Sequence, residues 1–168
     1  QLRLGIAHPI AGRRNAYIAP VAMPAVLSRM FSFAPQFERL RIRPGFDCGF
    51  PLCKLTDEQL GWLYRYTGSH YDFGCATVID ICPDMSVISC FPLSAFHRRS
   101  LFEFNSLEEI HAYYGELHRR IRIEMGGIYE ECDNCRFREE HLCAGGCLAH
   151  SLNTFRTEHP VRMEEVYF

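Results

Sequence analysis

The sequence contains no apolar run close to the roughly 18–20 residues that a membrane-spanning helix needs. Its first residues also lack the basic and then apolar pattern of a signal peptide. With a net charge of −2 and a pI near 6.5, the chain has no overall positive field that would attract nucleic acid. These absences argue against membrane and nucleic-acid partners and predict a cytoplasmic protein.

Internal repeats and low-complexity segments are absent as well, and a hydrophobic content of 48% is typical of a globular chain. A length of 168 residues suffices for one domain or for two small ones. The chain begins with Gln rather than Met, and Leu2, Leu4 and Ile6 already alternate as in a sheet strand. We therefore expect a fragment, the C-terminal part of a longer protein.

Residues 1–70 are predicted to form two strand-then-helix units, with strands at residues 2–7 and 39–43. The first helix is predicted to begin at Pro24, because proline favours the first helical position, and the second at Thr56. Two consecutive units of this kind have parallel strands and right-handed crossovers. The predicted fold class is therefore α/β, with these residues as the terminal βα units of a partial (β/α) barrel.

The ends of these two helices carry their own signals. Pro35 is expected to end the first helix, since proline cannot continue one. Thr56 and Gln59 match a capping box, in which each side chain satisfies a backbone N–H of the other residue. Gly68 is expected to close the second helix in a left-handed conformation.

Residues 71–168 are predicted to form a small cysteine-rich domain. Residues 75–90, CATVIDICPDMSVISC, have two runs rich in Val and Ile around a Pro-Asp turn, which indicates a β-hairpin with a cysteine at each outer end. Ser106 and Glu109 match a second capping box, which predicts the start of a packing helix. Apolar residues recur in it at helical spacing, namely Leu107, Ile110, Tyr114, Leu117 and Ile121. No element is predicted after residue 150.

Nine cysteines are too sparse for a secreted disulfide scaffold of this length, and clustered thiols in a reducing compartment indicate a metal. Four of them fall within residues 132–147, CDNCRFREEHLCAGGC, in the pattern C-x2-C-x7-C-x3-C. Gly145 and Gly146 allow the backbone to approach a bound centre closely. The pattern is specific for a metal but not for which metal, because zinc and iron–sulfur clusters both take four thiolates.

The number of cysteines favours iron over zinc. One structural zinc bound within residues 132–147 would use four of the nine cysteines and leave five unexplained. Two four-cysteine centres need eight ligands, so nine cysteines fit two centres with one to spare.

Together, the hairpin segment and the downstream cysteines resemble the SPASM domain, the C-terminal extension of many radical S-adenosylmethionine enzymes such as peptide maturases and anaerobic sulfatase-maturating enzymes. The signature of that family is a Cys, nine to fifteen residues, a Gly, four residues and a Cys, then C-x2-C-x5-C-x3-C and a final Cys. The resemblance covers about residues 70–150. Residues 1–68 are more weakly similar to the last βα units of the partial barrel that precedes SPASM.

The chain departs from this signature in three places. Met85 stands where the family has its turn glycine, which predicts a turn that avoids positive φ. The downstream half contains two extra residues. No cysteine follows Cys147, so the family's last ligand is missing.

The resemblance implies one or two auxiliary [4Fe-4S] clusters. The first would be bound by Cys75, Cys90 and Cys147. The second would be bound by Cys132, Cys135 and Cys143. Each set lacks a fourth ligand, and the candidates for it are Cys48, Cys53 and Cys82.

Cys48 and Cys53 follow the second predicted strand, at the end where α/β folds gather their ligands. One of these two is expected to complete the first cluster. Cys82 lies on the hairpin and is interpreted as a small buried side chain.

The chain lacks the C-x3-C-x2-C spacing that holds the S-adenosylmethionine-cleaving cluster in this family. The resemblance therefore implies that S-adenosylmethionine binds only to the full-length parent, an oxidoreductase or peptide-modifying enzyme. The implied role of this part is electron transfer, with an electron-donor protein as partner, and engagement of a peptide or small-molecule substrate.

Two readings from other classes stay open. One is a non-enzymatic structural zinc module that uses Cys132, Cys135, Cys143 and Cys147. The other is a free-standing electron-transfer protein.

Overall fold

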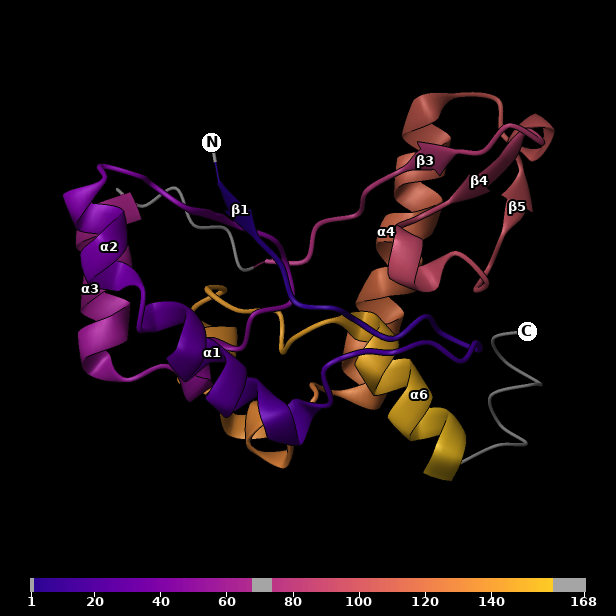
Figure 1. Ribbon diagram of the computed structural model, residues 1–168. Helices are drawn as coiled ribbons and strands as arrows, with labels where there is room; N and C mark the ends of the chain where they lie inside the picture. Colours follow the sequence, from indigo (N-terminus) through magenta and orange to yellow (C-terminus); the bar gives the residue numbers. More distant parts are fainter. Residues whose placement is uncertain (1, 68–73, 159–168) are drawn as a thin grey trace. The chain divides into compact units, whose positions relative to one another are not determined.

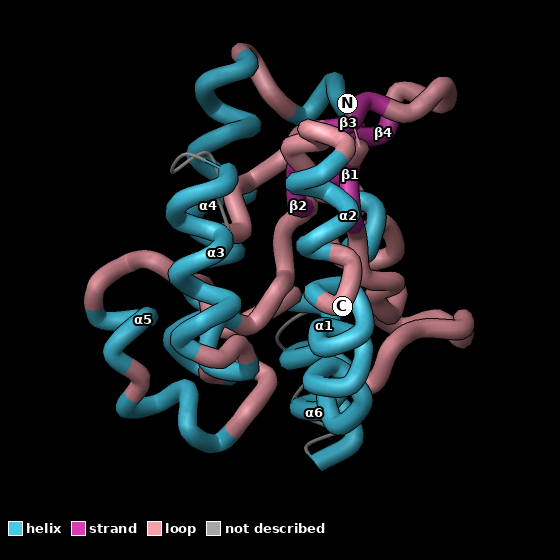
Figure 2. The backbone as a smooth tube through the Cα atoms, turned by 60° about the vertical axis from the view of Figure 1, so that its left-hand side comes forward, coloured by secondary structure: helices cyan, strands magenta, loops and turns pink. Residues whose placement is uncertain are grey.

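The computed structural model describes residues 2–67 and 74–158 (Figure 1). They form a mixture of helices and short strands, as Figure 2 shows, in agreement with the coarse α/β prediction. Contacts divide the chain into two compact units. Unit 1 comprises Gln1–Ala7, Tyr17–Cys75 and Tyr129–Cys147, and unit 2 comprises His8–Ala16, Ala76–Ile128 and Leu148–Phe168. These two units are defined by contacts alone and do not test the predicted division into domains 1–70 and 71–168. That division stays a prediction.

Unit 1 contains a parallel pair of strands, β1 (Arg3–Leu4) and β2 (Gly45–Phe46), as the two βα units predicted. β1 lies within the predicted strand 2–7 but is shorter. The predicted strand 39–43 is wrong, because this segment is the end of a helix and the turn after it. Leu40 is 59% exposed and Arg41 has a left-handed φ of 53°, so the backbone is not extended here and Leu40 does not face a core.

Two helices precede β2 in unit 1. α1 (Met23–Phe31) has Pro24 in its first turn, as predicted. Pro35 was predicted to end the first helix, and this prediction is wrong. Pro35 lies in the first turn of α2 (Ala34–Arg39), where the missing N–H removes no helical hydrogen bond.

α3 (Asp57–Thr67) follows β2, and its predicted capping box is confirmed. The Gln59 N–H donates to Thr56 Oγ1 at 3.2 Å, and the Thr56 N–H donates to Gln59 Oε1 at 3.0 Å. Gly68, predicted to close this helix, lies outside the described residues. Trp62 of α3 is buried, and its ring lies edge-on to Phe31 of α1, which joins the two helices into one apolar layer.

Residues 129–147 of unit 1 contain a 3-10 helix, Glu130–Asn134, and the short helix α5 (Arg136–Glu139). After α5 the chain reverses. His141 has a φ of 58°, and the N–H groups of Leu142 and Cys143 both donate to the Phe137 carbonyl, at 2.8 and 3.0 Å. This reversal returns Cys143 toward the start of α5.

Unit 2 contains an antiparallel sheet in the order β3 (Asp80–Ile81), β4 (Ser86–Ile88) and β5 (Arg99–Ser100). β3 and β4 form an antiparallel pair at the predicted place, with Asp80 opposite Ile88. β5 was not predicted, since two residues carry no readable alternation.

The helix α4 (Leu107–Met125) is confirmed at its predicted start, where the Glu109 N–H donates to Ser106 Oγ at 3.2 Å. The Glu109 carboxylate binds the N–H of Asn105 rather than that of Ser106, so the predicted box is only half formed. Four of the five predicted apolar residues are buried, and Leu107 is exposed. The buried face also includes His118, a polar residue that the apolar spacing does not predict.

The helix α6 (Leu148–Glu158) was missed in the region after residue 150. It lies along the C-terminal part of α4 (Figure 1), where Ser151 Oγ donates to the Gly126 carbonyl at 3.4 Å. Leu148 and Leu152, four residues apart, are buried and supply the helical spacing that could have revealed it. Within the described residues, no helix is long and apolar enough to cross a membrane.

The turn between β3 and β4 corrects one further prediction. Met85 has a φ of 60°, so the turn uses the left-handed conformation even though a glycine is absent. A residue with a Cβ therefore adopts, at a steric cost, a conformation that glycine adopts freely.

Met85→Gly is expected to stabilise the hairpin, because glycine adopts this φ without a clash at Cβ. The matched control is Met85→Ala, which keeps a Cβ in the same conformation. The free energy of unfolding of the glycine variant should exceed that of the alanine variant by about 1 kcal/mol. Urea unfolding curves measure this difference, and equal midpoints would show that the turn carries no strain.

Candidate metal-binding thiol groups

All nine cysteines lie in the described part of the chain, and none of them forms a disulfide bond. Unit 2 contains Cys82 and Cys90. Unit 1 contains the other seven, namely Cys48, Cys53, Cys75, Cys132, Cys135, Cys143 and Cys147. Most of the metal-binding capacity of the chain is therefore in unit 1.

The loop after β2 presents two of these thiols. The Asp47 N–H donates to the Leu4 carbonyl at 2.9 Å and extends the pairing of β2 with β1. Phe50 and Leu52 are then almost completely buried, whereas Cys48 and Cys53 are exposed. The two buried side chains fix the loop to the core and leave both thiols accessible.

Cys53 lies close to three thiols of the downstream segment, Cys132, Cys135 and Cys143. Burial raises the pKa of Cys53 to about 11; the charge of Lys54 opposes this shift, and the charges of the three downstream thiolates add to it. The pKa of Cys132 is likewise raised, first by burial and then by the charges of Cys143 and Cys135. Charges influence one another in this way only at short range, so these residues, called the Cys53 group below, share one neighbourhood.

Cys48 pairs with a different thiol. A side-chain hydrogen bond with Cys75 is the main reason that the pKa of Cys48 lies well above its usual value, and burial and the charges of Cys75 and Asp47 add to the shift. Cys147 also lies in unit 1, where it is buried directly after Gly146. Unit 1 therefore contains the pair of Cys48 and Cys75 besides the Cys53 group.

These positions refine the predicted ligand sets. Cys132 and Cys143 do lie near each other, as the second set required. Either Cys48 or Cys53 was expected to complete the first ligand set. Cys53 instead lies beside the three thiols of the second set. Cys48 contacts Cys75 of the first set. No spacing in the sequence could separate these roles, because Cys48 and Cys53 occupy the same loop.

Cys82 differs from the small buried side chain that was predicted, since it is only half-buried. It occupies the β3–β4 turn, where its N–H donates to the Ser86 carbonyl at 2.8 Å and its carbonyl accepts from Met85 at 2.9 Å. Cys90 of unit 2 is also half-buried.

The Cys53 group is not arranged around a single ion. In the described part of the chain, no three His, Cys, Asp or Glu side chains have the arrangement of ligands to one metal ion. A tetrahedral zinc site with Zn–S bonds of about 2.3 Å would hold its sulfurs about 3.8 Å apart. In a four-iron cluster each thiolate binds a different iron, so the sulfurs lie further apart. Four thiols from two segments are a donor set that either a zinc ion or a four-iron cluster can use.

The backbone near Cys143 offers a further feature of cluster sites. Gly145 and Gly146 have positive φ values of 78° and 86°, and the Gly145 N–H donates to Cys143 Sγ at 3.4 Å. Hydrogen bonds from backbone amides to ligand sulfur stabilise the thiolate and tune a bound cluster. A side chain at either glycine would strain this turn.

Two cations lie beside the Cys53 group. Arg138 Nη1 donates to the Cys132 carbonyl at 2.9 Å, and its charge lowers the pKa of the Cys132 thiol. Lys54 Nζ lies 3.5 Å from Glu131 Oε1 and 4.1 Å from the centre of the Tyr129 ring. Positive charge at both segments offsets the repulsion between gathered thiolates.

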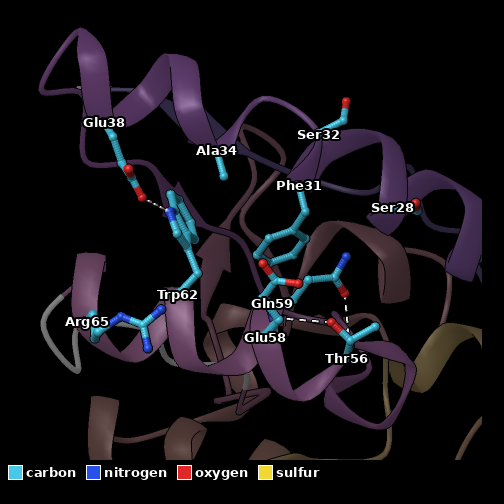
Figure 3. A pocket seen from close by; sticks show the side chains of 10 residues that line it. All are labelled: Ser28, Phe31, Ser32, Ala34, Glu38, Thr56, Glu58, Gln59, Trp62 and Arg65. Carbon is cyan, nitrogen blue, oxygen red and sulfur yellow. Dashed lines mark hydrogen bonds between the residues drawn. The ribbon is translucent and has the colours of Figure 1, made fainter.

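A groove of about 530 Å³ between α1, α2 and α3 has no cysteine in its lining (Figure 3). Phe31 and Trp62 supply its apolar part. Trp62 Nε1 donates to Glu38 Oε1 at 2.6 Å, and the Thr56–Gln59 pair caps α3, so these polar groups serve the fold. The groove therefore adds no ligand to the thiol groups.

The chain matches no model of a known protein family, and no solved structure matches it significantly.

Proposed function

We propose that this chain is the auxiliary [4Fe-4S] cluster-binding part of a radical S-adenosylmethionine oxidoreductase or maturase. In this proposal residues 1–70 are the terminal βα units of a partial (β/α) barrel, and residues 71–168 are a SPASM-like domain. The observation that supports it best is the Cys53 group, in which a thiol from the β2 loop joins three thiols from a distant segment. Iron–sulfur clusters commonly collect ligands in this way.

The residues of the Cys53 group fit a cluster chemically. Four thiols provide the full ligand set, the Gly145 N–H binds one sulfur, and Lys54 and Arg138 supply positive charge. A bound four-iron cluster supplies one-electron transfer. The chain itself holds the thiols in place and sets the charge around them.

The second site is proposed on the pair of Cys48 and Cys75. Their hydrogen bond brings an upstream thiol to the first cysteine of the hairpin segment. Cys147 and Cys90 are the further ligands that the resemblance implies. S-adenosylmethionine, a peptide or small-molecule substrate, an electron-donor protein and a cytoplasmic location are proposed for the parent enzyme.

Metal analysis of the anaerobically purified and reconstituted chain tests this proposal. We expect brown protein with about eight irons and eight sulfides, as two four-iron clusters require. Colourless protein with one zinc and no iron would overturn it in favour of the zinc module on Cys132, Cys135, Cys143 and Cys147. Purification without oxygen is essential to the comparison, because exposed clusters decay and zinc then occupies the vacated thiols.

A further inference from the structure

Cys53 reaches the other three thiols of its group only because two separate segments pack together. Cys53 belongs to the 3-10 helix Leu52–Lys54, whereas its partners follow Tyr129 in the chain. No covalent bond joins these segments at the site. Some non-covalent contact next to Cys53 must therefore hold them in register.

Lys54 provides such a contact. Its side chain is only 23% exposed, and its ammonium lies between the Glu131 carboxylate, at 3.5 Å, and the face of the Tyr129 ring, at 4.1 Å from the ring centre. Glu131 directly precedes Cys132. An ammonium over an aromatic face and beside a carboxylate is attracted to both groups.

Tyr129 is itself fixed to the rest of unit 1. Its hydroxyl donates to the Pro20 carbonyl at 2.8 Å, at the start of the turn that leads into α1. Burial raises the pKa of Tyr129 to about 12, and the charges of Cys53 and Cys132 contribute to this shift, so the ring lies beside the thiols. Lys54 therefore binds an anchored ring rather than a free one.

The choice of residue supports a specific role for this side chain. Lys54 is the only lysine among the 18 Lys and Arg residues of the sequence, and it directly follows Cys53. An ammonium is a compact point charge on a long apolar stem, whereas the guanidinium of arginine is broad and planar. Its charge also acts on the Cys53 thiol in the direction that favours the thiolate.

We propose that Lys54 is a positioning residue for the Cys53 group: it fastens the Cys53 loop to the Tyr129–Glu131 segment, and its charge raises the reduction potential of the centre bound there. The second half rests on the proposed function. A nearby cation favours the reduced state of a cluster, because reduction adds negative charge. Glu131 is largely exposed, so water screens its opposing charge more than that of Lys54.

The positioning half is tested on the full chain after its metal has been removed by chelation. A short bis-maleimide, which alkylates two thiols, is applied without oxygen after the reductant has been removed, and links between Cys53 and Cys132 or Cys135 are quantified by mass spectrometry. Lys54→Met keeps the stem without the charge and is expected to lower this yield at least fivefold, while Lys54→Arg restores most of it. Arg65→Met, which removes an exposed cation from α3 of the same unit, is the control and should change nothing.

The charge half is tested on the iron-loaded chain by spectroelectrochemistry. Lys54→Met is expected to lower the ratio of reduced to oxidised cluster about tenfold at a fixed applied potential. For a one-electron couple this equals a shift of the reduction potential by about 59 mV to more negative values. Lys54→Arg should stay near the unaltered chain. Acetylation of this single lysine side chain removes the same charge without a mutation, which keeps the test decisive if Lys54→Met folds poorly.

These outcomes separate the inference from the proposed function. A chain that binds no iron overturns the proposed function, and the cross-linking yields then decide the positioning role alone. Unchanged yields and an unchanged potential in Lys54→Met would overturn the inference while the proposed function stands. Lower yields with an unchanged potential would retain the positioning role and reject the role of the charge.

Discussion

Replacing Cys53 by alanine is expected to halve the iron content of the reconstituted chain, from about eight to about four atoms per chain. Cys53 is an upstream thiol that lies beside the downstream segment, since the charges of Cys132, Cys135 and Cys143 all raise its pKa. Without it, the site has three protein ligands and an iron open to water and chelator. The measurement is iron and sulfide analysis after gel filtration with a chelator, together with the electron paramagnetic resonance spectrum of the reduced protein.

Cys82→Ala is the matched control for this experiment. Cys82 is also a thiol outside the 132–147 segment, but it lies in the β3–β4 turn of unit 2, and it is the spare cysteine of the proposed two-cluster scheme. Its removal should leave the iron content unchanged. Full iron content in Cys53→Ala, or an equal loss in Cys82→Ala, would contradict the assignment of Cys53 as a ligand.

The sequence predicted the ligand types of the candidate site but not their grouping. Cys132, Cys135 and Cys143 lie in one short segment, so their spacing and the reversal after α5 bring them together by local geometry. Cys53 joins them through packing between distant segments, which depends on Lys54 and Tyr129. Spacing along the chain carries no information about such a contact.

The same distinction explains which elements were predicted. The start of α3 was found because Thr56 and Gln59 form a local hydrogen-bonded box that depends on neither sheet nor core. The segment 39–43 was misassigned because alternation of Leu40 and Ile42 over five residues also fits a turn after a helix. α6 was missed because its two buried leucines are only one helical turn apart among polar residues.

Met85 shows that tertiary context can impose a conformation that its residue type disfavours. A residue with a Cβ disfavours positive φ, so a negative φ was predicted for Met85, and the observed value is 60°. The Leu101 N–H donates to the Met85 carbonyl at 2.8 Å, so pairing with the segment after β5 helps to hold the turn. Residue type is therefore a weak guide where a neighbouring segment binds the turn.

Lowering the pH from 7 to 5 is expected to remove about 2 kcal/mol of stability through His118 alone. His118 is 3% exposed on α4, and its Nε2 lies 2.8 Å from the hydroxyl of the buried Ser89. Burial lowers its pKa from 6.5 to about 4, and the charge of Arg122 adds to the shift. Its Nδ1 has no hydrogen-bond partner among the described residues, so the folded state offers little to a proton at that atom.

The sign follows from the two pKa values. Between about pH 6.5 and pH 4 the unfolded chain binds a proton at this histidine and the folded chain does not, so acid favours unfolding. The contribution is fully present above the unfolded pKa and declines as the pH falls toward the folded one. Urea midpoints of the metal-free chain at pH 7 and pH 5 measure it without interference from acid-labile metal binding.

In His118→Leu, the loss of unfolding free energy between pH 7 and pH 5 is expected to be about 2 kcal/mol smaller than in the unaltered chain. His111 is an exposed histidine on the same helix, and His111→Leu should leave this loss unchanged. His150 on α6 is also buried with its pKa lowered to about 4, so part of the acid sensitivity should persist in His118→Leu and become smaller in the double variant. An unaltered pH dependence in His118→Leu would mean that His118 binds a proton as readily in the folded chain as in the unfolded one. The hydrogen bonds that join α4 to Val87 and Ser89 would then not exclude the proton from this histidine.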